Sequence, residues 1–169
     1  MINAPPPVLN FARVLAYAIL DESVQWTGRQ TLFYGGREVG PVPCLALCQN
    51  TWGNHKDILL FHCNVDWEVL GTSSAPSLDE ARASAENAYR GVDTKWIMLN
   101  TSEEEAREWI RRDCKNMLCS FCERIPPEIE QLIRGKSAGI CNYCAGEIPR
   151  LMKGNGKTTD DDDFPQSGE

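Results

Sequence analysis

Cys119-Ser120-Phe121-Cys122 opens the stretch that decides the fold of the C-terminal part of this chain, and Cys141-Asn142-Tyr143-Cys144 closes it after eighteen intervening residues. A CxxC turn brings two sulfurs within one edge of a tetrahedron, and two such turns complete a closed four-coordinate site with Zn–S distances of about 2.3 Å. We therefore predict one structural Zn²⁺ per chain, with ligands Cys119, Cys122, Cys141 and Cys144.

The predicted metal supplies folding energy that a module of about 35 residues cannot obtain from its own core. All four positions are filled by protein, which favours a structural role over hydrolysis. Two disulfides, or an iron site of the rubredoxin kind, remain the alternatives. We rank both below zinc because of the spacing and a cytosolic context in which thiols stay reduced.

These residues resemble the N-terminal zinc-binding domain of the ClpX chaperone over about a fifth of the chain. The similarity includes Glu128, Leu132-Ile133, Gly135 and Ile140 between and around the cysteines. The resemblance implies a treble-clef-like fold in which Cys141 and Cys144 lie at the start of a helix from Asn142 to about Met152. It also implies homodimerisation through an apolar face and docking of substrates or adaptor proteins. By resemblance, the residues shared between core and dimer face are Phe121, Ile129, Leu132, Ile133 and Ile140.

Several positions depart from that family. Pro126-Pro127 replaces polar residues after the first turn, and Pro149 is expected to shorten or kink the final helix. The module precedes an ATPase in the chaperone but stands at the C-terminal end of this sequence. Gly154 to Thr158 is not a phosphate-binding loop, because Leu151 occupies the position where that motif requires its first glycine.

The sequence of the N-terminal part predicts an α+β domain that consists of a small, mostly antiparallel sheet with one covering helix. Strands are expected at 12–20, 31–34, 42–47, 58–63, 67–71 and 95–99, and the 42–47 strand is expected to return from 31–34 after a turn at Gly35-Gly36. A helix is expected from Ser77 to a C-cap at Gly91. The expected organisation is a sheet domain at 1–100, a connecting helix at 101–116, the zinc module at 117–152 and a disordered acidic tail at 153–169.

Composition limits the function classes. The net charge of −7 and the pI near 4.9 argue against a nucleic-acid partner, which usually meets a basic patch. No apolar stretch approaches the roughly 20 residues of a membrane span, and the N-terminus does not read as a signal peptide. We therefore expect a cytoplasmic protein.

The N-terminal domain offers weak candidate sites. We expect Cys44, Cys48, Cys63 and Cys114 to pack as small hydrophobic residues, although a second metal site from Cys44, Cys48, Cys63 and His55 is a less favoured alternative. Acid–base pairs of His55 with Asp57 or His62 with Asp66 are disfavoured, because no nucleophile motif accompanies them. Trp52 is the best candidate for an exposed binding anchor.

The same domain loosely resembles small bacterial domains of unassigned function. The similarity comprises a strand ending at Cys63, then Trp67, the helix from Ser77 to Gly91, and Trp96. Taken together, the sequence predicts a non-enzymatic, homodimerising interaction protein that serves as an adaptor or regulator of Clp-type protein quality control. The alternative is a toxin-immunity or inhibitor protein that binds its target through the N-terminal domain.

Overall fold

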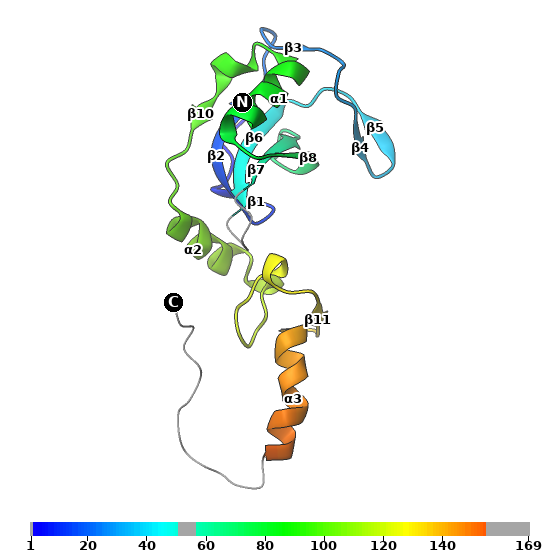
Figure 1. Ribbon diagram of the computed structural model, residues 1–169, viewed down its shortest axis with the longest axis vertical. Helices are drawn as coiled ribbons and strands as arrows, with labels where there is room; N and C mark the ends of the chain where they lie inside the picture. The colour runs from blue at the N-terminus through cyan, green and yellow to red at the C-terminus, as the bar shows by residue number, and fades with distance from the viewer. Residues whose placement is uncertain (1, 51–56, 155–169) are drawn as a thin grey trace. The chain divides into compact units, whose positions relative to one another are not determined.

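The computed structural model describes residues 2–50 and 57–154 and divides the chain into two compact units, Met1–Lys115 and Asn116–Glu169 (Figure 1). Helix α2 (Glu103–Asp113), predicted as a connector, belongs to the first unit. Its capping box pairs Ser102 with Glu105, whose oxygen accepts from the Ser102 N–H at 2.7 Å. Trp52 and His55 lie outside the described residues, as does the predicted tail beyond Gly154.

An antiparallel sheet organises the first unit, as predicted for an α+β fold. Strand β2 (Ala12–Ile19) pairs on one side with β1 (Val8–Leu9) and β10 (Ile97–Met98). On its other side follow β6, β7 and β8 in that order. Their bounds are Cys44–Asn50, Ile58–Cys63 and Val69–Ala75.

One helix covers a face of this sheet. Helix α1 (Leu78–Ala88) begins at the predicted N-cap Ser77, whose hydroxyl accepts from the Glu80 N–H at 3.2 Å. It packs over β6, β7 and β8 through a stripe of buried alanines, whose small side chains let helix and sheet approach closely. The first core lies at this contact; its members include Ala16, Leu45, Leu47, Leu60, Ala81, Ala85, Ala88, Tyr89 and Val92.

A second core lies on the opposite face of the sheet. A β-bulge changes which residues of β2 face each core: Val14 pairs with Cys48 and Ala16 with Leu47, so that one extra residue reverses the alternation. The Trp67 ring meets the Tyr17 ring edge-on at 5.5 Å, and its indole N–H donates to the Asn3 carbonyl at 2.8 Å. The second core comprises Leu9, Ala12, Val14, Tyr17, Cys44, Ala46, Cys48, Phe61, Cys63 and Trp67.

Three predicted strands, 42–47, 67–71 and 95–99, differ from the structure. The second is β8, Val69–Ala75, because Trp67 at φ 64° belongs to the turn before the strand. The strand returning from β4 (Leu32–Tyr34) is β5 (Arg37–Val39), not 42–47, because Gly35 and Gly36 adopt positive φ angles and make a two-residue turn. The predicted 42–47 strand is instead central β6. The last strand shortens to β10, because Val92–Lys95 forms a 3₁₀-helix (η1).

The predicted C-cap of α1 is also wrong. The helix ends at Ala88 with Tyr89 as its C-cap, because Tyr89–Arg90 (β9) leaves the helix to pair with Gln25–Trp26 (β3). Gly91, at φ 93°, begins η1 instead.

The second unit is a small module of short elements. It contains a 3₁₀-turn at Pro126–Glu128 (η3), a hairpin of β11 (Leu132–Arg134) and β12 (Gly139–Cys141), and helix α3 (Asn142–Gly154). A further 3₁₀-turn, Lys115–Met117 (η2), spans the boundary between the units. Helix α3 continues past Pro149 to Gly154, so the proline does not shorten it and the first two residues of the predicted tail are helical.

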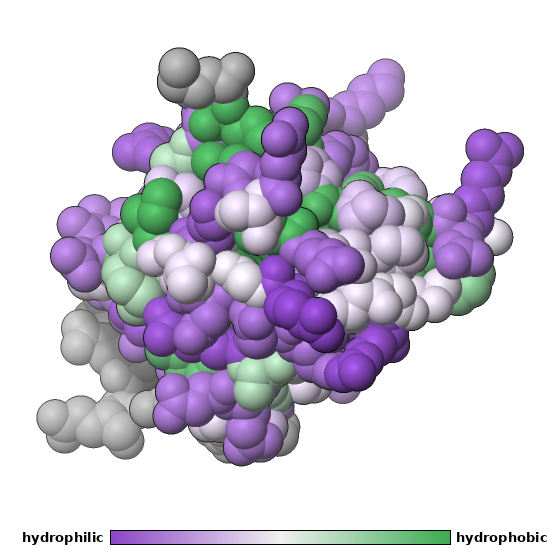
Figure 2. All heavy atoms as spheres, turned by 90° about the horizontal axis from the view of Figure 1, so that it is seen from above, coloured by the Kyte–Doolittle hydropathy of each residue, from purple (hydrophilic) through white to green (hydrophobic). Residues whose placement is uncertain are grey.

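On the face seen in Figure 2, polar side chains predominate and apolar side chains form separate small groups between them. Among the described residues of the first unit, the large exposed apolar side chains are those of Trp26, Phe33, Tyr34, Val65, Ile97 and Met98. No helix in the described ranges is long and apolar enough to cross a membrane.

His62 is a polar residue inside the first core. Its side chain is fully buried, 6.0 Å from the ring of Tyr89, and neither ring nitrogen has a hydrogen-bond partner among residues 2–50 and 57–154. Burial lowers the pKa of His62 from 6.5 to about 4, because the apolar surroundings disfavour the charged imidazolium.

The burial of His62 predicts acid sensitivity of the fold. Below pH 6.5 His62 becomes protonated in the unfolded chain, whereas in the folded chain it stays neutral until about pH 4. The free energy of unfolding therefore falls as the pH decreases across this interval. The loss amounts to about 3 kcal/mol at 1.36 kcal/mol per pKa unit. Denaturant unfolding at several pH values should show a flatter pH dependence for His62→Phe than for wild type. The matched variant His55→Phe, which removes the other histidine, should keep the wild-type slope; equal slopes in all three proteins would contradict the prediction.

Candidate metal centre

The four predicted zinc ligands converge in the second unit. All four sulfurs of Cys119, Cys122, Cys141 and Cys144 lie within 4.8 Å of one another. The Cys122 and Cys141 sulfurs are 3.7 Å apart, close to the tetrahedral edge of about 3.8 Å that a 2.3 Å Zn–S bond requires. This separation is far from the disulfide bond length of about 2.05 Å. The donor set therefore fits one metal ion and not two disulfides.

The first CxxC turn is held by its own backbone. The Glu123 N–H donates to the Cys119 carbonyl and the Cys119 N–H donates to the Arg124 carbonyl, both at 2.9 Å. Closing this turn places Glu123 in the left-handed region at φ 58°, a conformation that normally favours glycine. Backbone strain is therefore built into the residue directly after the ligand Cys122.

The second CxxC turn joins a strand to a helix. Cys141 is the last residue of β12 and Cys144 lies in the first turn of α3, as the resemblance implied. Main-chain N–H groups point at the sulfurs: that of Cys141 donates to the Cys119 sulfur at 3.3 Å, and that of Cys144 to the Cys141 sulfur at 3.4 Å. These donors stabilise thiolates before any metal contributes.

Two residues inside the CxxC turns position the ligands, and the sequence interpretation missed both. The Ser120 N–H donates to the Gly139 carbonyl at 2.8 Å, and its hydroxyl accepts from the Gly139 N–H at 3.0 Å. The Asn142 side-chain oxygen accepts from the N–H groups of Glu130 and Gln131 at 3.2 and 3.3 Å. Their polar character at spacer positions was the available signal, because such side chains can bind neighbouring backbone.

The thiols differ in their tendency to ionise. Burial would raise the pKa of Cys119, but N–H groups of Cys122, Cys141 and Phe121 lower it to about 6. Burial and the neighbouring thiols raise the pKa of Cys144, and burial also raises that of Cys122. Four thiolates this close repel one another, so complete deprotonation requires a cation at their centre. Zn²⁺ supplies that charge when bound and holds the two turns together.

The other candidate residues do not assemble into a site. Cys44, Cys48 and Cys63 are fully buried in the second core, and burial raises the pKa of each. Among the residues that the structure describes, no other group of three or more His, Cys, Asp or Glu side chains is placed to hold a metal. The disfavoured acid–base pair of His62 with Asp66 does not form, because neither His62 ring nitrogen has a hydrogen-bond partner among the described residues.

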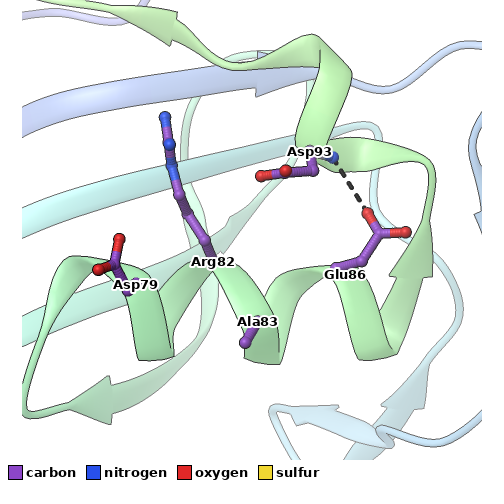
Figure 3. Close-up of a pocket in the computed structure, with 5 residues that line it drawn as sticks. All are labelled: Asp79, Arg82, Ala83, Glu86 and Asp93. Atoms are coloured by element: carbon purple, nitrogen blue, oxygen red, sulfur yellow. Dashed lines mark hydrogen bonds between the residues drawn. The ribbon is translucent and has the colours of Figure 1, made fainter.

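Charged side chains line a polar pocket on α1. It encloses about 310 Å³ and is lined by Asp79, Arg82, Ala83, Glu86 and Asp93 (Figure 3). The Glu86 carboxylate accepts from the N–H groups of Gly91 and Asp93 at 2.8 and 3.1 Å. It therefore caps the start of η1, and the lining includes no nucleophile beside a base.

The comparisons agree with the geometry. Residues 118–154 match the family model described as the ClpX C4-type zinc finger. No curated protein and no solved structure matches the chain. The chain therefore contains a ClpX-type C4 zinc finger with one structural Zn²⁺, and the match lies entirely within the second unit.

Loss of one ligand should unfold the module alone. Structural Zn²⁺ contributes on the order of 10 kcal/mol to such modules, so Cys141→Ser should abolish amide-exchange protection across 118–154 while β6 and β7 stay protected. Metal analysis should show about one zinc per chain in wild type and well below one in the variant. Cys114→Ser, a matched change outside the cluster, should leave both unchanged. A fully protected module without zinc would refute the assignment.

The strained backbone of Glu123 leads to a second prediction. A left-handed non-glycine residue costs about 1 kcal/mol or more, so Glu123→Gly should keep or raise the zinc affinity and thermal midpoint of the module. Glu123→Val should lower both, because a β-branched residue tolerates this conformation poorly. Competition with a chromophoric chelator measures the affinity. A glycine variant that binds zinc more weakly than the valine variant would contradict the expected strain.

Proposed function

We propose that this chain is a non-enzymatic, cytoplasmic interaction protein whose zinc finger pairs with a second copy and docks another polypeptide. In this proposal it acts as an adaptor or regulator in Clp-type protein quality control. The observation that carries the proposal is the combination of a closed four-thiolate site with several large exposed apolar side chains on the same small module.

The closed ligand set supports a structural use of the metal. Four cysteine sulfurs complete a tetrahedron, so no coordination position is left for water or substrate. A metal in such a site can make its surroundings rigid but cannot activate a nucleophile. The role of the metal is therefore to stabilise the shape and the surface of the module.

The apolar surface of the module supports a protein partner. Phe121 is 67 % exposed, Leu151 66 % and Met152 75 %. Soluble monomers rarely expose many large apolar side chains close together, and such groups usually mark an interaction site. We refer to the large exposed apolar side chains of the second unit as its apolar surface; among the described residues they are Met117, Phe121, Ile133, Tyr143, Ile148, Leu151 and Met152.

Helix α3 arranges three of these side chains as one stripe. Ile148, Leu151 and Met152 follow the i, i+3, i+4 pattern that places side chains on one helix face. Because α3 continues past Pro149, the last turn stays helical and presents Leu151 and Met152 together. A second copy that covers this stripe removes apolar area from water, at roughly 25 cal/mol per Å².

The surface differs in part from the one that the resemblance implied. Phe121 and Ile133 are exposed as that interpretation requires. Ile129, Leu132 and Ile140 are only partly exposed. Ile148, Leu151 and Met152 of α3 are more exposed than these three residues.

Charge on the module argues against a phosphate-tracking surface. The Arg124 guanidinium lies 5.0 Å above the Tyr143 ring, and Arg150 pairs with Glu147 at 3.2 Å. The zinc tetrathiolate adds negative charge at the centre. These features favour a protein partner over a nucleic acid.

The oligomeric state tests the proposal. The double variant Leu151→Ser, Met152→Ser should convert a zinc-loaded dimer to a monomer at micromolar concentration in sedimentation experiments, and chelation of zinc should do the same. The matched control Phe33→Ser removes an equally exposed apolar side chain from the first unit and should leave the dimer intact. A dimer that survives both the double variant and chelation would overturn this proposal.

Affinity capture with the full chain tests the pathway. Recovery of Clp components by wild type, and their loss with the double variant, would support the adaptor role. Recovery of a single toxin that still binds the double variant would favour the immunity or inhibitor protein instead.

A further inference from the structure

The outer edge of β8 is the long free edge of the sheet. On the opposite side of the sheet, β2 is flanked by β1 and β10. β8 pairs only with β7 in the sheet, and no backbone hydrogen bond joins its outer side to another described segment. Alternate N–H and C=O groups along this edge are therefore available to an added strand.

β8 lacks the features that usually block an edge. Its sequence, Val69-Leu-Gly-Thr-Ser-Ser-Ala75, has no charge and no proline. One register shift lies at its start, between His62 and Cys63 of β7, and the pairing of Thr72 to Ala75 is regular. The Thr72 and Ser74 side chains are exposed and small, so they leave room for the side chains of a neighbouring strand.

An aromatic hairpin stands beside this edge. β4 contacts β8 without pairing, and Figure 1 shows the β4–β5 hairpin next to it. Leu32 packs closely on Gly71: a Cβ atom added to Gly71 would lie 2.8 Å from the Cδ2 atom of Leu32. The Tyr34 hydroxyl donates to the Glu68 carboxylate at 2.7 Å. These contacts hold the hairpin in place and leave Phe33 65 % exposed.

The charge around the edge is acidic. The segments 32–39 and 57–80 together carry six carboxylates and one cation, Arg37. Asp66 and Glu68 precede the strand, and Asp79 and Glu80 follow it. Asp57 precedes Ile58, the residue that pairs with Ala75. Carboxylates thus occur near both ends of β8, and they repel a second copy of the same edge while attracting a basic segment.

We propose that the outer edge of β8 binds an extended, lysine- or arginine-rich segment of a partner protein as an added strand. Main-chain hydrogen bonds to β8 hold the segment, Phe33 and Tyr34 contact its apolar side chains, and the carboxylates bind its cations. This site lies in the first unit and does not depend on the zinc finger, so it is independent of the function proposed above.

A peptide of alternating Val and Thr between lysine pairs serves as the probe, with zinc-loaded full-length protein. We expect binding by fluorescence anisotropy and new amide-exchange protection confined to β8. The same core between glutamate pairs should bind at least tenfold more weakly. Thr72→Lys with Ser74→Lys should weaken the basic peptide at least tenfold, whereas the matched pair Ser84→Lys with Thr94→Lys, which adds the same charge elsewhere, should bind as wild type.

Three results would overturn this proposal: equal binding of the acidic and basic peptides, protection on the zinc finger in place of β8, or equal losses in both lysine pairs. Self-association of the protein that protects β8 would also overturn it, because a second copy would then be the occupant. Chelation of zinc should leave peptide binding intact, which separates failure here from failure of the dimer proposal.

Discussion

Repulsion among four converging thiolates is the constraint on which the second unit depends. The sulfurs lie within 4.8 Å of one another, yet burial raises the pKa of Cys122 and Cys144. A divalent cation resolves this conflict because it binds all four thiolates. The short hairpin, the 3₁₀-turn and helix α3 have little core of their own, so their arrangement follows from the metal.

The first unit is held together by different means. A single antiparallel sheet has apolar residues on both faces, and one bulged residue in β2 lets Val14 and Ala16 serve opposite cores. Alanines on α1 permit close packing on one face, while Trp67 and Tyr17 contribute to the other. The exception is His62, a polar group in an apolar core whose ring nitrogens have no hydrogen-bond partner among the described residues, and burial disfavours its charged form. Stability of this unit is thus linked to pH, whereas stability of the module is linked to metal.

The two units present surfaces of different chemistry. The module exposes an apolar stripe on a metal-held scaffold, whereas the first unit exposes a strand edge among carboxylates. Apolar surfaces favour association through loss of water contact, and strand edges through directional hydrogen bonds. A protein with both can hold two partners by independent interactions, an arrangement that suits an adaptor.

The sequence by itself determined the ligands, the metal and the class of fold. Spacing of Cys119, Cys122, Cys141 and Cys144 is a local property, and so are the capping residues Ser77 and Ser102 and the apolar run of β7. Only the tertiary structure decided that Ser120 and Asn142 position the ligands, that 42–47 lies in the centre of the sheet, and that α3 presents an apolar stripe past Pro149. The physical reason is range: turn chemistry and periodicity act over a few residues, whereas strand order, burial and exposure depend on which distant segments meet.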